Sequence, residues 1–248
     1  MIPDMTRRSS EPEKMDRSDC DTGLLLRTID QFQLTNRLFS RYRTLLRRWV
    51  LSDMLSRPTQ EFHLVDLGAG GLDIPLWLLR EAHRRGIQLR ITAVDNDPRI
   101  IEHVRPKAGA NLHLVCGDAL AFLEKASGVD YIFCNHFLHH LPELEIPDFI
   151  RRLARATRRR FIVSDLSRNR WSYLGYALFA GLFLRHSFAR EDGLLSIRRG
   201  FRAEDLEAFV KTPEGSTTMD LLRLAPGRIV LIGTSGSSRF PPTGSGNL

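Results

Sequence analysis

The chain is poor in cysteine, with Cys20, Cys116 and Cys134 as the three among its 248 residues. An odd number without C-x-x-C spacing excludes a fully paired disulfide framework and indicates no cysteine-based zinc site. The sequence therefore fits a reducing compartment. We expect a cytoplasmic protein and no metal ligands.

Long hydrophobic runs are scarce as well. The apolar stretch YLGYALFAGLFL, Tyr173–Leu184, has twelve residues, whereas a membrane span needs ~20. The first twenty residues lack the apolar segment of a secretory signal and are polar, so we expect residues 1–22 to form a disordered tail. A second tail, rich in Gly, Ser and Pro, is expected over residues 236–248.

No single block of one charge dominates the chain, although its net charge is +7. The arginines are spread over several expected helices, which is typical of a basic soluble surface. With 42% apolar residues, the chain can bury the core of one ordinary domain. Residues 24–55 carry apolar positions at three- and four-residue spacing, which predicts a pair of helices forming an N-terminal cap over residues 23–57.

The sequence is organised around FHLVDLGAGGLDIP, Phe62–Pro75. A buried strand, Phe62–Leu67, runs into a glycine-rich turn and then into a helix that ends near Gly86. Such a turn lets the backbone approach a ligand at a helix N-terminus, so we expect a nucleoside-containing cofactor. Leu72 stands where a third spaced glycine would fall, and plain tight-turn chemistry is the alternative.

Four further apolar strands are predicted, and a polar residue follows each of them. The strands span residues 89–94, 112–116, 131–134 and 161–164, and the polar residues are Asp95, Asp118, Asn135 and Asp165. The carboxyl ends of parallel strands form the edge at which open α/β sheets bind ligands. Helices are expected over residues 143–157 and 203–210, and strands 219–224 and 228–233, joined by Pro226-Gly227, predict an antiparallel hairpin.

Asp95 lies 24 residues beyond Gly71 (95 − 71). An acidic residue at that distance can accept hydrogen bonds from the ribose hydroxyls of a nucleoside. A helix-capping role before Pro98 is the alternative, and Asp97 suits that role better.

Four motifs, in this order, resemble those of class I S-adenosylmethionine-dependent methyltransferases: VDLGAGGLDIP, AVDNDP, CGDAL and VDYIFCNHFLHHL. The Gly70-Gly71-Leu72-Asp73 variant is most similar to the quinone and small-molecule branch. The resemblance implies a Rossmann-like α/β fold over residues 58–235. Its seven-stranded, mostly parallel sheet would have helices on both faces and an antiparallel C-terminal hairpin.

The resemblance also implies roles for site residues, with S-adenosyl-L-methionine as the cofactor. The loop around its amino-acid end would be shaped by Asp66, Gly68, Ala69 and Gly70, and Asp73 would bind the ammonium group. The ribose would lie at Asp95 and Asn96, the adenine at Asp118 and the backbone of Ala119, and the methionyl portion at Asn135.

A general base is expected after the fourth strand, where His136, His139 and His140 stand. A histidine oriented by a carboxylate can accept a proton near neutral pH, so Asp165 with His139 or His140 is our predicted catalytic dyad. These histidines could instead only cap or pack. His186 and Asp192 are weaker alternatives.

The insert over residues 165–200 predicts a hydrophobic small-molecule acceptor, such as a phenol, quinol or polyketide-like molecule methylated on O or C. It supplies Trp171, Tyr173, Phe179 and Phe183 as an expected wall. Its core is apolar on all sides, so protein, a ligand or a lipid surface should cover it. Flanking arginines, Arg168, Arg170 and Arg185, also suit transient contact with a membrane surface.

Three alternatives remain at this point. An RNA methyltransferase would rest on Arg151, Arg152, Arg155, Arg158, Arg159 and Arg160, but the Asn/Asp-Pro-Pro-aromatic pattern of DNA amine methylases is missing. An NAD-dependent oxidoreductase would use the same turn and Asp95, although the glycine spacing fits it poorly. A cofactor-binding module without catalysis is the third.

Overall fold

The computed structural model describes residues 3–210 and 217–236. Most of the expected C-terminal tail, from residue 237 on, lies outside the described residues. Within them, seven strands form one sheet in the order β3-β2-β1-β4-β5-β7-β6. The strands are β1 (Phe62–Leu67), β2 (Leu89–Asp95), β3 (Leu112–Cys116), β4 (Val129–Asn135), β5 (Thr157–Leu166), β6 (Thr218–Leu224) and β7 (Arg228–Thr234).

The predicted fold class is confirmed. β1 to β5 pair in parallel, whereas β7 runs antiparallel to both β5 and β6. The strand order reverses between β1 and β4. From β1 the sheet continues outward through β2 and β3, and from β4 it continues outward on the other side through β5, β7 and β6. Ligands of open α/β sheets bind outside the carboxyl ends of the strands at such a switch point.

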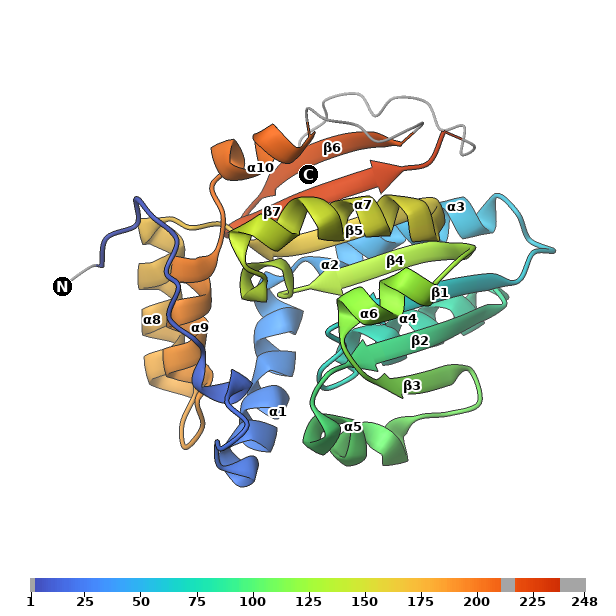
Figure 1. Ribbon diagram of the computed structural model, residues 1–248. Coiled ribbons are helices and arrows are strands. Elements are labelled where there is room, and N and C mark those ends of the chain that lie inside the picture. The colour runs from blue at the N-terminus through green and yellow to red at the C-terminus, as the bar shows by residue number, and fades with distance from the viewer. Residues whose placement is uncertain (1–2, 211–216, 237–248) are drawn as a thin grey trace.

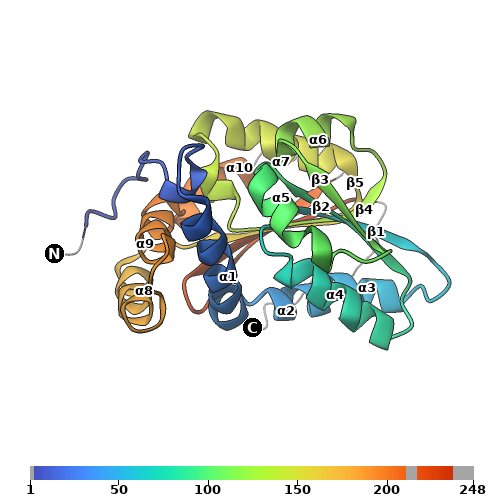
Figure 2. The ribbon, with the colours of Figure 1, turned by 90° about the horizontal axis from the view of Figure 1, so that it is seen from below.

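Helices cover both faces of the sheet, as Figure 2 shows. α2 (Tyr42–Leu46), α3 (Ser52–Leu55) and α4 (Asp73–Arg84) pack on one face. α6 (Ala119–Lys125), α7 (Ile146–Ala156) and α10 (Ala203–Val210) pack on the other. A five-residue π-type turn, η2 (Arg47–Leu51), joins α2 to α3, and α5 (Pro98–Val104) follows β2.

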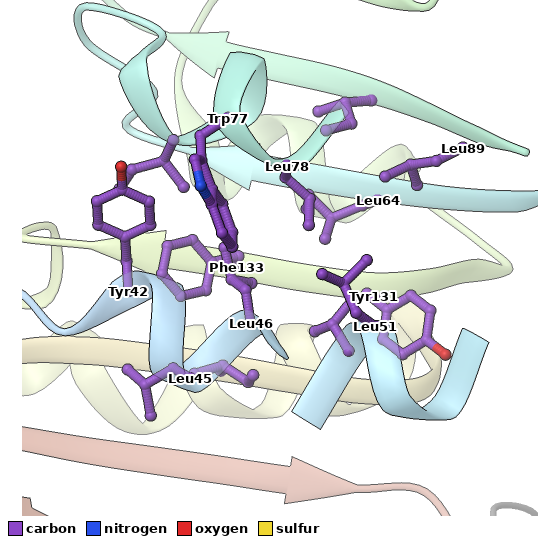
Figure 3. Packing of buried hydrophobic residues seen from close by; sticks show 14 of the residues in the cluster. Tyr42, Leu45, Leu46, Leu51, Leu64, Trp77, Leu78, Leu89, Tyr131 and Phe133 are labelled. Atoms are coloured by element: carbon purple, nitrogen blue, oxygen red, sulfur yellow. The ribbon is translucent and has the colours of Figure 1, made fainter. Parts of the chain in front are cut away.

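The packing on the first face is shown in Figure 3. Trp77 and Leu78 of α4 pack against Leu46 of α2. On the sheet side they face Leu64 of β1 and Phe133 of β4, and all five side chains are buried. Burying a leucine or phenylalanine side chain is worth roughly 1.5–3 kcal/mol. This packing fixes α4, and with it the glycine-rich turn that precedes the helix.

A third group of helices stands at the carboxyl ends of the parallel strands (Figure 1). It consists of α1 (Thr22–Phe39), α8 (Arg170–Phe183) and α9 (Ala189–Arg199). The helical pattern predicted before the sheet is thus divided at Arg41, whose φ is 57°, into the long α1 and the shorter α2 to α3. The predicted apolar insert is a pair of helices, because α8 ends at Phe183 and α9 follows it.

Residues 3–20 differ from the expected disordered tail. They run along α9 beside the open end of the sheet (Figures 1 and 2), and include a short 3₁₀ turn, η1 (Lys14–Asp16). Met5 and Glu13 are 5% and 1% exposed, respectively. Low hydrophobicity suggested that this segment could not pack, but its polar groups find buried partners on α9 instead, so hydrogen bonds and ion pairs hold it in place.

Candidate active site

A cavity of about 1040 Å³ opens at the carboxyl ends of β1, β2 and β4. The cavity is lined by every predicted site residue except Asp165: Asp66, Gly68, Ala69, Gly70, Asp73, Asp95, Asn96, Asp118, Ala119, Asn135, His139 and His140. The topology therefore brings residues that lie more than 70 positions apart in the chain to one space. The remaining walls come from residues 13–18, α1, α8 and α9.

The glycine-rich turn is tied directly to Asp95. Gly70 donates its backbone N–H to Oδ2 of Asp95 at 2.9 Å, and the N–H of Asp97 reaches Oδ1 at 3.1 Å. A Cβ at Gly68, whose φ is +69°, would lie 2.8 Å from the ring of Phe137, so glycine is needed there for conformation and space. Leu72 also has a positive φ, 63°, and its fully buried side chain packs in the core on the α4 face.

Two more carboxyl groups lie deep in the same end of the cavity. Burial, together with the neighbouring charges of Asp73 and Asp95, raises the pKa of Asp66 well above its usual range. Burial raises the pKa of Asp73 to about 6 despite hydrogen bonds that oppose the shift. Crowded carboxylates lacking a cation are costly, and an ammonium group bound here would relieve that cost.

Asn36 of α1 is a candidate site residue that no sequence pattern predicts. Its Nδ2 lies 3.4 Å from both Asp73 carboxylate oxygens, and its Oδ1 accepts from Nδ2 of Asn135 at 3.2 Å. It thus joins the start of α4 to the end of β4. No local motif marks this residue, because both contacts depend on how α1 lies across the strand ends.

Arg228 was also missed, and it is 2% exposed at the start of β7. Its Nη2 donates to Oδ1 of Asn135 at 2.6 Å and to Oγ of Ser164 at 2.8 Å, while Nη1 lies 2.9 Å from Nε2 of His136. Burial lowers the pKa of Arg228 to about 10, so it stays charged at neutral pH. Burial and the Arg228 charge hold the pKa of His136 well below its usual range.

The predicted pair of His139 and Asp165 is in contact. Nδ1 of His139 lies 2.7 Å from Oδ1 of Asp165, whose other oxygen accepts from the His139 backbone N–H at 3.0 Å. Burial opposes charge on both groups, yet their mutual attraction raises the pKa of His139 to about 9 and holds that of Asp165 well below its usual range. At neutral pH His139 is therefore protonated, so its role as a general base stays a prediction.

Residues from the N-terminal segment complete this cluster. Oε1 of Glu13 lies 3.3 Å from Nε2 of His139, and Asp16 Oδ2 is 2.9 Å from Nδ1 of His140. Both acids belong to the segment that the sequence predicts to be a disordered tail. No pattern in the sequence marks contacts that span more than 120 residues.

The weaker candidates lie elsewhere. Neither His186 nor Asp192 lines the cavity. Asp192, which is 1% exposed, accepts hydrogen bonds from the backbone N–H groups of Lys14 and Met15 at 2.9 Å each, so it anchors η1.

Two of the acidic residues after the strands cap helices. Asp118 accepts from Ala121 N–H at 2.8 Å and caps α6, and Asp97 accepts from Arg99 N–H at 2.8 Å and caps α5.

The aromatic wall differs from the expected one. Of the four aromatic residues predicted to face the acceptor, Trp171 lines the cavity, whereas Tyr173, Phe179 and Phe183 do not. The other aromatic lining residues are Phe32 and Phe39 of α1, Phe137, and Tyr176 of α8. The apolar run of α8 thus points only partly inward, because its neighbours α1 and α9 cover one of its faces.

The six arginines behind the RNA alternative are not at the cavity. Three lie on α7, and Arg158, Arg159 and Arg160 begin β5, at the opposite end of the strand from the cavity. Several are engaged locally: Nε of Arg152 lies 2.6 Å from Asp148, and Arg159 is within 3.6 Å of Asp53 and 3.4 Å of Asp130.

Residues 64–160 match a family model described as a methyltransferase domain. A search of curated proteins finds no match to the sequence. The matched span runs from β1 into β5 and contains the glycine-rich turn, Asp95, Asp118 and Asn135. The match covers 97 of the 248 residues (160 − 64 + 1), so it indicates a methyltransferase domain within the chain.

Solved structures share the whole fold at low sequence identity. Magnesium protoporphyrin IX methyltransferase (ChlM) from Synechocystis PCC 6803 with bound SAH is 14% identical, with coverage of 90% of this chain and 91% of that one and a TM-score of 0.54. The plantazolicin methyltransferase BpumL in complex with SAH is 12% identical, with coverage of 84% and 90% and a TM-score of 0.63. At this identity, the likeness shows the fold alone.

Proposed function

We propose that this enzyme transfers a methyl group from S-adenosylmethionine to a hydrophobic small molecule, such as a phenol, quinol or polyketide-like acceptor. The observation that carries the proposal is the single cavity shared by the cofactor loop and an aromatic wall. Gly68, Asp95 and Asn135 line it together with Phe39 and Tyr176. Solved methyltransferases of the same fold include proteins named for a porphyrin and for plantazolicin.

The residues at the strand ends fit the cofactor that the domain uses. The Asp73 carboxylate would hold the amino-acid ammonium, Asp95 the ribose hydroxyls, and Asp118 with the Ala119 backbone the adenine. The cofactor supplies an electrophilic methyl group on a sulfonium. The protein's main task is to align it with the acceptor in a dry pocket, which can supply roughly 7–11 kcal/mol of the barrier.

Proton removal accompanies methylation of a hydroxyl or an acidic carbon. The bond from sulfur to carbon breaks and its electron pair stays on sulfur, while the acceptor forms a new bond to carbon and loses its proton. We assign the proton's destination to His140, since His139 already carries a proton and pairs with Asp165. Both histidines line the cavity, and the His140 side chain is 26% exposed.

The test is turnover of S-adenosylmethionine with a panel of phenols and quinols, with RNA and peptides as competing acceptor classes. Gly175 of α8 lines the cavity, and a Cβ there would have no neighbour within 4 Å. We expect Gly175→Leu to fill the acceptor end and raise the acceptor KM about tenfold, a loss of ~1.4 kcal/mol. Binding of S-adenosylhomocysteine should stay within about twofold.

Gly181→Leu is the matched control, since Gly181 is on the same helix with equally open space but does not line the cavity. Its KM should remain that of the parent. Equal effects of the two substitutions, or turnover with RNA alone, would contradict the proposed acceptor class.

We also propose that α8 makes transient contact with a membrane surface, where an apolar acceptor would dissolve. Trp171, Leu178, Leu182 and Phe183 are 83%, 68%, 59% and 62% exposed, and basic residues Arg170 and Arg185 flank them. Exposed apolar side chains gathered on one helix and flanked by basic residues favour contact with a membrane surface. Among the described residues, no helix combines the length and apolar character that crossing a bilayer requires. Cytoplasmic location stays a prediction.

Co-sedimentation with anionic liposomes tests this contact. The double substitution Leu178→Ser and Leu182→Ser should abolish binding, because it removes two apolar side chains from the exposed face of α8. Leu144→Ser is the control, as Leu144 is 93% exposed but lies outside α8. Parent protein that stays in the supernatant would remove the proposal.

A further inference from the structure

The polar cluster of Glu13, His139 and His140 has the geometry of a metal site. One ligand atom from each residue lies within 4.8 Å of the other two. Glu13 is 1% exposed and His139 2% exposed, and the two imidazole rings lie side by side with centroids 4.3 Å apart. Two histidines and one carboxylate make up a common ligand set for zinc and other divalent transition metals.

The imidazole orientations fit metal binding in a second, independent way. Each histidine uses Nδ1 to contact a carboxylate: His139 meets Asp165 at 2.7 Å and His140 meets Asp16 at 2.9 Å. Both Nε2 atoms are thereby directed to Glu13, at 3.3 Å from Oε1 and 4.0 Å from Oε2. Metal-binding histidines almost always have such a carboxylate or carbonyl partner on the other nitrogen.

The buried Nε2 of His139 has no hydrogen-bond partner within the described part of the chain, although Glu13 lies close to it. Its nearest acceptor is Oε1 of Glu13 at 3.3 Å, and a cation between the two groups would bind both. The carboxylate of Glu13 is itself held in position, because Ser196 donates its hydroxyl to Oε1 at 2.8 Å.

The surroundings favour a cation and hold the ligands in place. The carboxylates of Asp16 and Asp192 lie near Glu13, and Asp165 contacts His139. The guanidinium of Arg199 lies 3.6 Å from Asp16. Arg199 also donates to the backbone carbonyl groups of His139 and His140 at 3.1 and 3.2 Å, which fixes the turn that carries them. Ligands positioned by a surrounding shell bind metal without reorganisation.

We propose that Glu13, His139 and His140 bind one divalent transition-metal cation, with Asp165 and Asp16 orienting the two histidines. The three ligands line the cavity, so the remaining coordination positions are reachable from it. The site requires the N-terminal segment, because that segment brings Glu13. A cation here would occupy Nε2 of His140, so metal binding and proton transfer to His140 exclude each other. Metal binding does not depend on which molecule is methylated.

The experiment titrates Zn²⁺ into the chelator-treated full chain by calorimetry, and a parallel Co²⁺ titration records the visible absorption of the bound ion. The proposal predicts one equivalent per chain and a Co²⁺ spectrum of low coordination number. Both Glu13→Gln and His140→Gln should weaken binding at least tenfold. Glu11→Gln is the matched control, as Glu11 is an exposed residue of the same segment paired with Arg198.

Binding of S-adenosylhomocysteine, measured on every variant, shows that the fold is intact and reports on the cofactor site separately. His140 is the more exposed ligand, so His140→Gln remains informative should Glu13→Gln fail to fold. Zn²⁺ binding that is absent in the parent, or equal in the parent and His140→Gln, would overturn the proposal whatever the methyl acceptor proves to be.

Discussion

Asp66, Asp73 and Asp95 place three carboxyl groups at one end of the cavity. The pKa of each is raised, with burial as the largest cause. A raised pKa means that the folded protein holds the proton more tightly than the unfolded chain, so ionisation costs stability at higher pH. A cation bound among these groups would offset that cost, as would the ammonium group that we propose lies at Asp73.

The pH dependence of cofactor binding follows from Asp73, whose pKa is about 6. Above pH 6 its carboxylate is ionised and can pair with an ammonium, whereas below pH 6 it is protonated and cannot. We expect the affinity for S-adenosylhomocysteine to fall up to about tenfold between pH 7.5 and pH 5. Calorimetric titration across this range measures the effect.

Asp73→Asn is the partner experiment. The amide cannot ionise, so binding should be weaker at pH 7.5 and should vary less with pH than in the parent. An unchanged pH profile in this variant would show that Asp73 does not meet the ammonium group.

Sequence patterns predicted the acidic and glycine residues of the site but not Asn36 or Arg228. Asp95 and Gly70 belong to short motifs with fixed positions relative to strand ends, so local spacing reveals them. Asn36 and Arg228 instead reach Asn135 from 99 and 93 residues away. An asparagine on a helix and an arginine at a strand start are ordinary residues until the tertiary structure brings them to the strand ends.

At the scale of elements, α9 anchors the N-terminal segment through Asp192. Its carboxylate accepts the N–H groups of Lys14 and Met15 at the start of η1, which helix geometry leaves without partners in their own turn. Ser9 N–H also donates to Arg198 O at 3.1 Å. The segment is therefore held along α9 chiefly by polar groups.

Removal of this anchor should loosen the segment. We expect Asp192→Ala to speed trypsin cleavage after Arg17 severalfold, because the backbone N–H groups of Lys14 and Met15 lose their charged acceptor, and hydrogen bonds to charged groups are worth about 1.5–3 kcal/mol each. Limited proteolysis followed by mass spectrometry measures the rate at that bond.

Glu191→Ala provides the comparison, since Glu191 is the adjacent acid and forms a surface ion pair with Lys14. Exposed pairs contribute about 0–1 kcal/mol, so cleavage should change little. Similar rates for the two variants would mean that Asp192 does not hold η1.

The elements themselves differ in how well the sequence predicts them. The central strands are continuous apolar runs followed by polar residues, and β1, β3 and the hairpin of β6 and β7 lie close to their predicted positions. The strand β5 begins at Thr157, because Thr157 pairs with Val129 and Arg160 pairs with Tyr131 and Thr234 despite three consecutive arginines. Tertiary pairing overrides the local polarity there.

For the whole molecule, repeated strand and helix patterns predicted the individual strands and the antiparallel hairpin, while the resemblance to class I methyltransferases implied the seven-stranded, mostly parallel sheet that the structure confirms. The covering layer at the strand ends was harder to predict. Residues 3–20 have the composition of a tail, yet they pack, since partners on α9 and on the turn after β4 compensate for their polarity. Such compensation depends on contacts across the full length of the chain and leaves no local pattern.

The central claim is that Gly68, Asp95, Asp118 and Asn135 surround one cofactor. Calorimetric titration with S-adenosylhomocysteine, on the parent and on Asp95→Asn, tests it most directly. In Asp95→Asn, the asparagine keeps an acceptor for Gly70 N–H but loses the negative charge. The parent should bind S-adenosylhomocysteine at one site. The variant should bind it about tenfold or more weakly, since hydrogen bonds to charged groups are worth ~1.5–3 kcal/mol. Binding of NAD in place of S-adenosylhomocysteine, or equal affinities in the two proteins, would contradict the claim.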